Sequence, residues 1–201
     1  MIKITVDNTA PLAMLNNLRR DLRAKVLGPA INKVAEKARA EINRAIPQEY
    51  AVKTGEIRSA INLRKAHSGK LEAVIEIFGS ARKKGRSLNL IHFVAAVQAA
   101  GRAYKVRGAK ATKKDLATLD RQIGFLIKRF GGIKKIEGAF VGNKGRTIFR
   151  RTGKARLSIE PVQVIGFAQM FSSKKISRRV IDKINAEFPV EVDRALRRLM
   201  G

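Results

Sequence analysis

The sequence predicts an α+β protein. A small antiparallel, partly barrel-like sheet is expected to pack with long N-terminal and C-terminal amphipathic helices. Apolar residues recur at helical spacing over 31–46 and again over 176–199, as in helices with one buried face. Between these stretches lie short apolar runs bounded by glycine-containing turns, which is typical of strands. The chain is 45% hydrophobic but only 5% aromatic, so we expect a core made mainly of aliphatic side chains.

The N-terminal part is expected to form one strand and a helix in two pieces. Ile2, Ile4 and Val6 alternate with polar residues, which favours a first or edge strand. A helix should run from Pro11 to about Val26, break at Gly28-Pro29, and restart there, because proline is favourable at a first helical position. Pro47 should end this second piece.

A short helix and a hairpin are expected next. Thr54 is a candidate cap for a helix that extends to about Ile61. The stretch 62–78 predicts two strands that turn at Ser68-Gly69. The apolar stretch 87–101 fits either a strand or a helix, because periodicity alone does not distinguish them in so short a run.

Residues 102–131 look like an insertion that carries an extra helix. The region starts as a polar basic connector, and Thr112 then begins a helix that Gly131 terminates. Its apolar face is a candidate subunit contact, although packing on the protein's own core explains such a face as well. The residues of this face are Leu116, Leu119, Ile123, Leu126, Ile127 and Phe130.

The C-terminal third is expected to contain hairpins followed by a helix. Strands over 134–166 should be joined by tight turns at Asn143–Gly145 and Thr152–Lys154. The last helix keeps its apolar residues in phase across Pro189, from Ile176 to Leu199. We therefore expect one bent helix or two nearly collinear ones.

Net charge is the strongest global signal. The chain carries +27, and the stretch 102–156 alone holds 17 lysines and arginines against three acidic residues. Such a field attracts nucleic acid, acidic proteins or anionic membranes, and it is also compatible with a subunit of a larger assembly. Two basic groups are candidate contacts with DNA or a partner. They are Arg82, Lys83, Lys84 and Arg86 in one loop, and Lys144, Arg146, Arg150, Arg151, Lys154 and Arg156 around a hairpin.

No catalytic, cofactor or metal site is expected. The absence of cysteine excludes disulfides, thiolate zinc sites and cysteine nucleophiles. His67 lies beside a predicted turn and His92 in an apolar run, so neither has a partner suited to catalysis. Glu72 and Glu76 share a face of a predicted strand, which leaves a metal-dependent nuclease as a remote alternative. The start shows no secretion signal and no stretch is apolar enough for a membrane span, so synthesis in a reducing cytoplasm is expected.

The stretch 138–171 resembles the minor tail protein Z family of tailed bacteriophages and prophages, also called tail-completion proteins. That family shows a Gly-Ala-Phe strand, glycine turns, an Arg-Leu-x-Ile strand and a Met-Phe element in this order. The matching residues are Gly138, Ala139, Phe140, Gly145, Phe149, Arg151, Gly153, Lys154, Arg156, Leu157, Ile159, Met170 and Phe171. The stretches 52–66 and 87–95 are similar to earlier family segments. The departures are Ile165-Gly166-Phe167, where a Gly-Pro pair is usual, and the insertion.

The resemblance implies a virion structural protein with one domain over 1–201, made and assembled in the cytoplasm of the host bacterium. It implies action at the head-proximal end of the tail, in an oligomeric ring, with sixfold symmetry favoured. The partners it implies are further copies of the chain, tail tube, tail terminator or neck proteins, and genomic DNA contacted without sequence specificity. No membrane and no small-molecule substrate is implied. The alternative function is a free basic nucleic-acid-binding protein of ribosome-associated or chromatin-like type.

Overall fold

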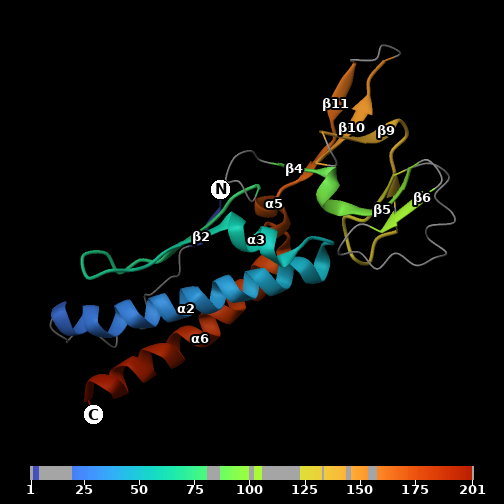
Figure 1. The fold of residues 1–201 in the computed structure, drawn as a ribbon. Coiled ribbons are helices and arrows are strands. Elements are labelled where there is room, and N and C mark those ends of the chain that lie inside the picture. The colour runs from blue at the N-terminus through green and yellow to red at the C-terminus, as the bar shows by residue number, and fades with distance from the viewer. Residues whose placement is uncertain are drawn as a thin grey trace.

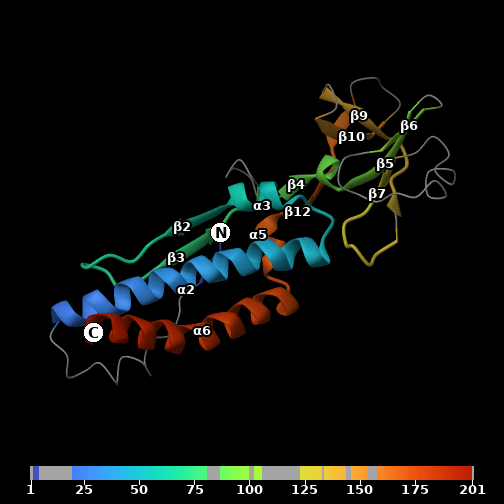
Figure 2. The same ribbon diagram turned by 60° about the horizontal axis from the view of Figure 1, so that its bottom comes forward.

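The computed structural model describes residues 2–4, 20–80, 87–99, 102–105, 123–132, 134–143, 146–153 and 158–200 (Figure 1). It confirms the α+β class. Helices α2 (Arg20–Glu49) and α6 (Lys174–Met200) lie side by side, and a three-stranded sheet lies along the other side of α2 (Figures 1 and 2). The remaining strands gather beyond the end of the helix pair at which α6 begins.

Helix α2 is continuous, so the expected break at Gly28-Pro29 is wrong. The helix includes both Pro29 and Pro47 and ends at Glu49. A proline inside a helix costs about 3 kcal/mol, yet packing of an apolar face supplies most of a helix's stability. The buried face of α2 begins at Val26 and Leu27 and continues past Pro29, and it holds the helix together through the proline. The expected residues 11–19 of this helix lie outside the described part of the chain.

Helix α6 is one helix through Pro189, as one of the two expected forms had it. Its buried stripe matches the predicted face and packs against α2; it comprises Ile176, Val180, Ile184, Phe188 and Val192. Leu199 was expected to continue the stripe, but it is 42% exposed because the helix pair no longer covers it near the C-terminus. Cross-helix pairs Glu49–Lys175 and Glu41–Arg179 show that the two helices run antiparallel.

The first sheet has the antiparallel order β1-β3-β2 and contains the predicted hairpin. Its strands are β1 (Ile2–Ile4), which is an edge strand as expected, β2 (Ile61–Arg64) and β3 (Val74–Ile77). Helix α3 (Thr54–Ala60) precedes β2. Thr54 is its first helical residue, and the cap position falls on Lys53 without a side-chain cap bond, so the predicted role of Thr54 is wrong.

The ambiguous stretch and the insertion contribute strands. β4 (Ser87–Asn89), the 3-10 helix η1 (Leu90–Phe93) and β5 (Val94–Ala99) follow one another. The sheet of β5 has the order β6-β5-β7-β8, with β6 (Arg102–Lys105), β7 (Ile123–Phe125) and β8 (Lys134–Lys135). The first residues of the expected polar connector therefore form strand β6, and residues 123–125, which were expected to be helical, form strand β7.

The second half of the insertion was mispredicted because pairing decides its structure. The stripe from Leu116 to Phe130 satisfies a helical period, but β7 pairs with both β5 and β8, and the Leu126 amide donates to the Phe93 carbonyl at 2.9 Å. Such long-range bonds override a local propensity of a few tenths of a kcal/mol per residue. Residues 106–122, which hold the start of the expected helix, lie outside the described residues.

The strands expected over 134–166 are confirmed. β9 (Ala139–Gly142), β10 (Thr147–Arg151) and β11 (Ile159–Pro161) form a sheet of order β11-β10-β9, and β12 (Gln163–Ile165) pairs with β4. Among the residues that the structure describes, the four sheets stay separate and open, so they do not close into the barrel-like form that was expected. Helix α5 (Phe167–Phe171) then leads into α6 and buries both Met170 and Phe171 in the core.

Candidate functional site

The β11-β10-β9 sheet carries the best-defined basic surface in the described part of the chain. Phe140 and Phe149 lie opposite each other in the register of β9 and β10, and their rings stack with centroids 6.0 Å apart. The Arg151 guanidinium lies over the Phe140 ring, 5.3 Å from its centroid, in a cation–π contact. The aromatic pair thus gives Arg151 a fixed position on an otherwise exposed strand.

Two residues need an unusual backbone to build this sheet. Gly138, just before β9, has a φ of +68°, and Asn143, just after β9, has a φ of +51°, both in the left-handed region. Glycine and asparagine are the residues that adopt this region most readily. The Asn143 carbonyl accepts a bond from the Arg146 amide at 3.2 Å, which orders the start of the return strand.

Strand β10 is anchored to the rest of the protein through Ile148 and Asn89. The Ile148 side chain is fully buried in the core. Its backbone amide donates to Asn89 Oδ1 at 2.8 Å, and its carbonyl accepts from Asn89 Nδ2 at 3.3 Å. The Asn89 amide group therefore takes the place of a neighbouring strand and attaches the sheet to β4.

The exposed arginines of this sheet differ in their surroundings. Arg146, Arg150 and Arg151 are all exposed. Arg150 pairs with Glu160 on β11 at 2.8 Å, but both side chains are about half exposed, so the pair contributes little to stability. The structure thus brings three predicted contact residues to one small sheet, where they remain accessible to an anion.

Elsewhere, carboxylates are matched with cations of the same chain. The pairs are Glu36–Lys65, Glu41–Arg179, Glu49–Lys175, Glu72–Lys70, Glu76–Arg64, Glu187–Lys183 and Asp193–Arg197. Since the chain has 43 lysines and arginines and only 16 acidic residues, this pairing leaves the positive excess on the surface. The excess is available for partners of opposite charge.

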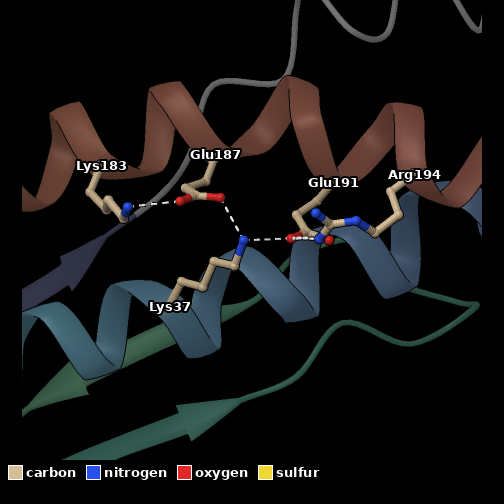
Figure 3. A network of polar contacts seen from close by, with 5 residues as sticks. All are labelled: Lys37, Lys183, Glu187, Glu191 and Arg194. Carbon is tan, nitrogen blue, oxygen red and sulfur yellow. Dashed lines mark hydrogen bonds and ion pairs between the residues drawn. The ribbon is translucent and has the colours of Figure 1, made fainter.

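The densest of these networks joins α2 to α6 (Figure 3). Lys37 Nζ lies 2.5 Å from both Glu187 Oε2 and Glu191 Oε1, while Lys183 holds Glu187 at 2.8 Å and Arg194 holds Glu191 at 2.5 Å. Hydrogen bonds from Lys183 and Lys37 lower the pKa of Glu187 to about 2. The hydrogen bond from Lys37 lowers the pKa of Glu191, although its burial opposes the shift. These ion pairs join α2 to α6 and keep both carboxyl groups ionised at neutral pH.

The other predicted contact residues have varied outcomes. Seven of the basic residues lie outside the described part: Arg82, Lys83, Lys84, Arg86, Lys144, Lys154 and Arg156. The motif residue Leu157 lies outside it as well. Of the family-motif positions, Ala139 and Phe140 begin β9, Gly153 follows β10, and Ile159 starts β11 with 38% of its surface exposed. These positions therefore build the basic sheet itself.

The predicted subunit-contact face does not exist as one helical face. Leu116 and Leu119 lie outside the described residues, and Ile123 is in β7. Leu126 is partly buried, and Ile127 packs against the core. Phe130, by contrast, is 87% exposed. Of the stripe residues whose side chains the structure describes, Leu126 and Ile127 are thus partly buried, and Phe130 alone is almost fully exposed.

Sequence reasoning missed an open cavity beside that ring. The cavity, of about 580 Å³, is lined by Pro47, Gln48, Glu49, Arg129, Phe130, Lys175 and Arg179. It lies where α2 ends and α6 begins, so its walls come from segments far apart in the chain. The one local signal was Phe130-Gly131-Gly132, in which two glycines after an aromatic residue favour a turn over a helix end.

The residues considered for catalysis are dispersed. His67 is exposed, and half-buried His92 lies with its Nδ1 2.8 Å from Glu56 Oε2. Glu72 precedes β3, so it does not share a strand face with Glu76 as was expected. Within the described ranges, no three histidine, cysteine or acidic side chains are grouped as a metal site would need. No helix in those ranges is long and apolar enough to cross a membrane.

Comparison with known proteins gives one clear match. Comparisons with curated proteins and with solved structures gave no significant match. The family model described as prophage minor tail protein Z (GPZ) matches residues 8–201, which is nearly the whole chain. This family favours a structural role over an enzymatic one. The chain therefore belongs to the prophage minor tail protein Z family and is a minor tail protein of a bacteriophage.

Proposed function

We propose that the protein is a tail-completion component at the head-proximal end of the phage tail. In this proposal several copies assemble into a ring around the DNA channel and join neighbouring tail or neck proteins. The family membership supports a place in the tail. The position of the exposed arginines supports contact with DNA in the channel.

The observation that carries the proposal is the projecting basic sheet. The sheet β11-β10-β9 extends away from the α2–α6 pair (Figures 1 and 2), and its exposed residues include Arg146, Arg150 and Arg151. Arginines on a strand contact phosphates without reading bases, which suits DNA that must slide past. Because Asn89 holds the backbone of β10 through two hydrogen bonds, the sheet keeps these cations at a defined place.

A ring explains why a few cations on one sheet are enough. Duplex DNA carries about one negative charge per 1.7 Å of its axis, so a single small sheet neutralises only a short stretch. Copies related by rotation would repeat the same arginines around the channel, and each copy would contribute weakly. We infer a ring of about six copies from the family resemblance, with the single domain 1–201 and its 102–131 insertion as the repeating unit.

Open strand edges support contact with neighbours. Each of the four sheets in the described ranges ends in two outer strands, and Val141 on outer strand β9 is 36% exposed. Unpaired edges are liabilities in isolated proteins, which usually cover or charge them. In an assembled tail, adjacent subunits would cover them, so we infer a virion component that is completed by its partners.

The first test is the mass of the purified protein in solution, by light scattering, with and without a short random DNA duplex at physiological salt. A ring, or a monomer that leaves DNA free, supports the assembly proposal; in the second case the tail itself would template the ring. A monomer that coats DNA tightly and releases it steeply with added salt would overturn the proposal in favour of a free nucleic-acid-binding protein.

The second test is complementation of a phage that lacks this chain. We expect tails to form but fail to join heads in its absence, and the wild-type chain to restore joined particles in electron micrographs. The double variant Arg150→Gln/Arg151→Gln should restore joining less well, whereas Arg39→Gln, an exposed arginine on α2, should act like the wild type. Normal joined particles without the chain would refute the proposed function.

A further inference from the structure

The turn that carries Phe130 is held firmly on the end of α2. The Arg129 amide donates to the Glu49 carbonyl at 2.9 Å, and the Ala51 amide donates to the Ile127 carbonyl at 2.9 Å. Arg129 Nε also donates to the Pro47 carbonyl. The two bonds from Arg129 satisfy the Glu49 and Pro47 carbonyls at the C-terminal end of α2, where the last carbonyls lack partners within the helix. Phe130 is therefore presented by an ordered turn.

The presented ring borders a cavity large enough for a side chain from another molecule. Phe130 is 87% exposed, and the adjoining cavity of about 580 Å³ is formed by both helix ends. An aromatic ring buries 150–250 Å² when covered, and aromatic and arginine side chains contribute disproportionately to binding at interfaces. Because the backbone that carries the ring is already ordered, less conformational entropy is lost when a partner covers it.

Positive charge surrounds the cavity. The walls hold Arg129, Lys175 and Arg179 against one carboxylate, Glu49, which already pairs with Lys175. Arg179 contacts Glu41 at 2.6 Å and Gln48 at 2.6 Å. The exposed neighbours of these residues in the chain are also cations: Lys128, Lys174 and Arg178. The cavity walls thus hold three cations, of which Lys175 and Arg179 pair with carboxylates, and three further exposed cations lie next to them in the chain.

We propose that this surface, the Phe130 cavity, binds an acidic segment of a different protein, with an apolar side chain of that segment packed on the Phe130 ring. A second copy of this chain fits poorly, because it carries a net charge of +27 and commits carboxylates along α2 and α6 to internal ion pairs. Like charges facing each other across an interface oppose association. The inference deepens the proposed function and rests on it for the identity of the partner as a neighbouring tail or neck protein.

The direct test uses a synthetic fluorescent peptide of about ten residues, mostly glutamate, with two leucines near its centre. Binding is followed by fluorescence anisotropy at about 0.15 M salt. We expect the Phe130→Ser variant to bind about tenfold more weakly, which corresponds to about 1.4 kcal/mol. The matched control Ile181→Ser removes another exposed apolar side chain, 47% exposed on α6, and should bind like the wild type. Phe130→Leu should recover part of the affinity.

Three results would overturn the inference. The wild-type protein could fail to bind the glutamate–leucine peptide, or the Phe130→Ser variant could bind it as tightly as the wild type does. A peptide whose leucines are replaced by serine could bind equally well, which would indicate charge attraction alone. Self-association that Phe130→Ser abolishes would make a second copy the occupant and would also overturn it. Thermal unfolding controls for folding, since Phe130→Ser should unfold like the wild type because the ring is exposed.

Complementation separates this inference from the proposed function. If Phe130→Ser joins heads and tails normally while loss of the whole chain blocks joining, the inference fails and the proposed function stands. If loss of the chain leaves joining intact, the proposed function fails, and the peptide measurement alone then decides whether the cavity binds acidic segments.

Discussion

Alanine at Gly142 should displace the aromatic pair of the basic sheet. A Cβ at this position would lie 2.8 Å and 2.9 Å from two ring carbons of Phe149. Ordinary contacts between carbon atoms are 3.5–4.0 Å, so the ring or the strand must move by about 0.7 Å or more. Phe149 cannot move freely because it stacks on Phe140, whose ring also contacts Arg151.

The expected loss of stability follows from two opposing terms. Overpacking of this kind costs about 1–3 kcal/mol. Replacing a strand glycine with alanine recovers about 0.5–1 kcal/mol, because the unfolded chain loses freedom. The middles of these two ranges differ by about 1 kcal/mol. We therefore expect Gly142→Ala to lower the free energy of unfolding by about 1 kcal/mol, which for a chain of this size lowers the unfolding temperature by about 2–4 °C.

Circular dichroism during thermal unfolding measures this change, with Gly153→Ala as the matched control. A Cβ at Gly153 would lie no closer than 3.4 Å to Ser158, so that variant should be neutral or slightly stabilised. The penalty of Gly142→Ala should also shrink in a Phe149→Leu background, where the ring is absent. An unchanged or raised unfolding temperature for Gly142→Ala, or an equal penalty in both backgrounds, would refute the reasoning.

Three further predictions concern the scaffold that holds this sheet and the helix pair. Phe188→Ala should lower the free energy of unfolding by about 3–5 kcal/mol because the ring is only 4% exposed between α2 and α6; Val190→Ala, at an exposed position, should change it little, and urea unfolding distinguishes the two. Asn89→Ala removes both hydrogen bonds to the β10 backbone and should cost about 1–3 kcal/mol, with faster amide exchange in β10 by NMR; unchanged exchange would contradict this role of Asn89. Glu187 has a pKa lowered to about 2, so its contribution to stability is complete above its ordinary value of 4.5 and is lost as the pH falls toward 2. Urea midpoints should therefore fall over this range in the wild type and fall less in Glu187→Gln.

The parts of the fold that follow from a strict period could be predicted from the sequence. The stripe of α6 from Ile176 to Val192 survives Pro189 because five buried side chains along one face outweigh one missing amide. The hairpin 61–77 was predicted by alternation on either side of Ser68-Gly69. In both cases local pattern and long-range packing favour the same structure.

The errors arose where tertiary contacts decide between local alternatives. Gly28-Pro29 favours a break, but burial of α2 on two sides keeps it helical. The stretch 123–130 satisfies a helical period, yet β5 and β8 pair with its first residues. The Phe130 cavity was unpredictable for the same reason, since its lining residues come from 47–49, 129–130 and 175–179. The basic sheet, by contrast, is built from neighbouring stretches of the chain. The sequence alone therefore indicated Arg146, Arg150 and Arg151 as candidate contacts.

Helix α2 has 30 residues, and at 1.5 Å per residue it is about 45 Å long. It packs antiparallel to α6, and the two helices form a stiff pair that Lys37 links near the middle of α2. The Phe130 cavity lies at one end of this helix pair, while the chain's C-terminus lies at the other (Figure 2). Partners bound at these two ends would be held apart by the length of the helix pair. Changing the length of α2 and α6 by matched whole turns should then alter the spacing of such partners in steps of about 5.4 Å.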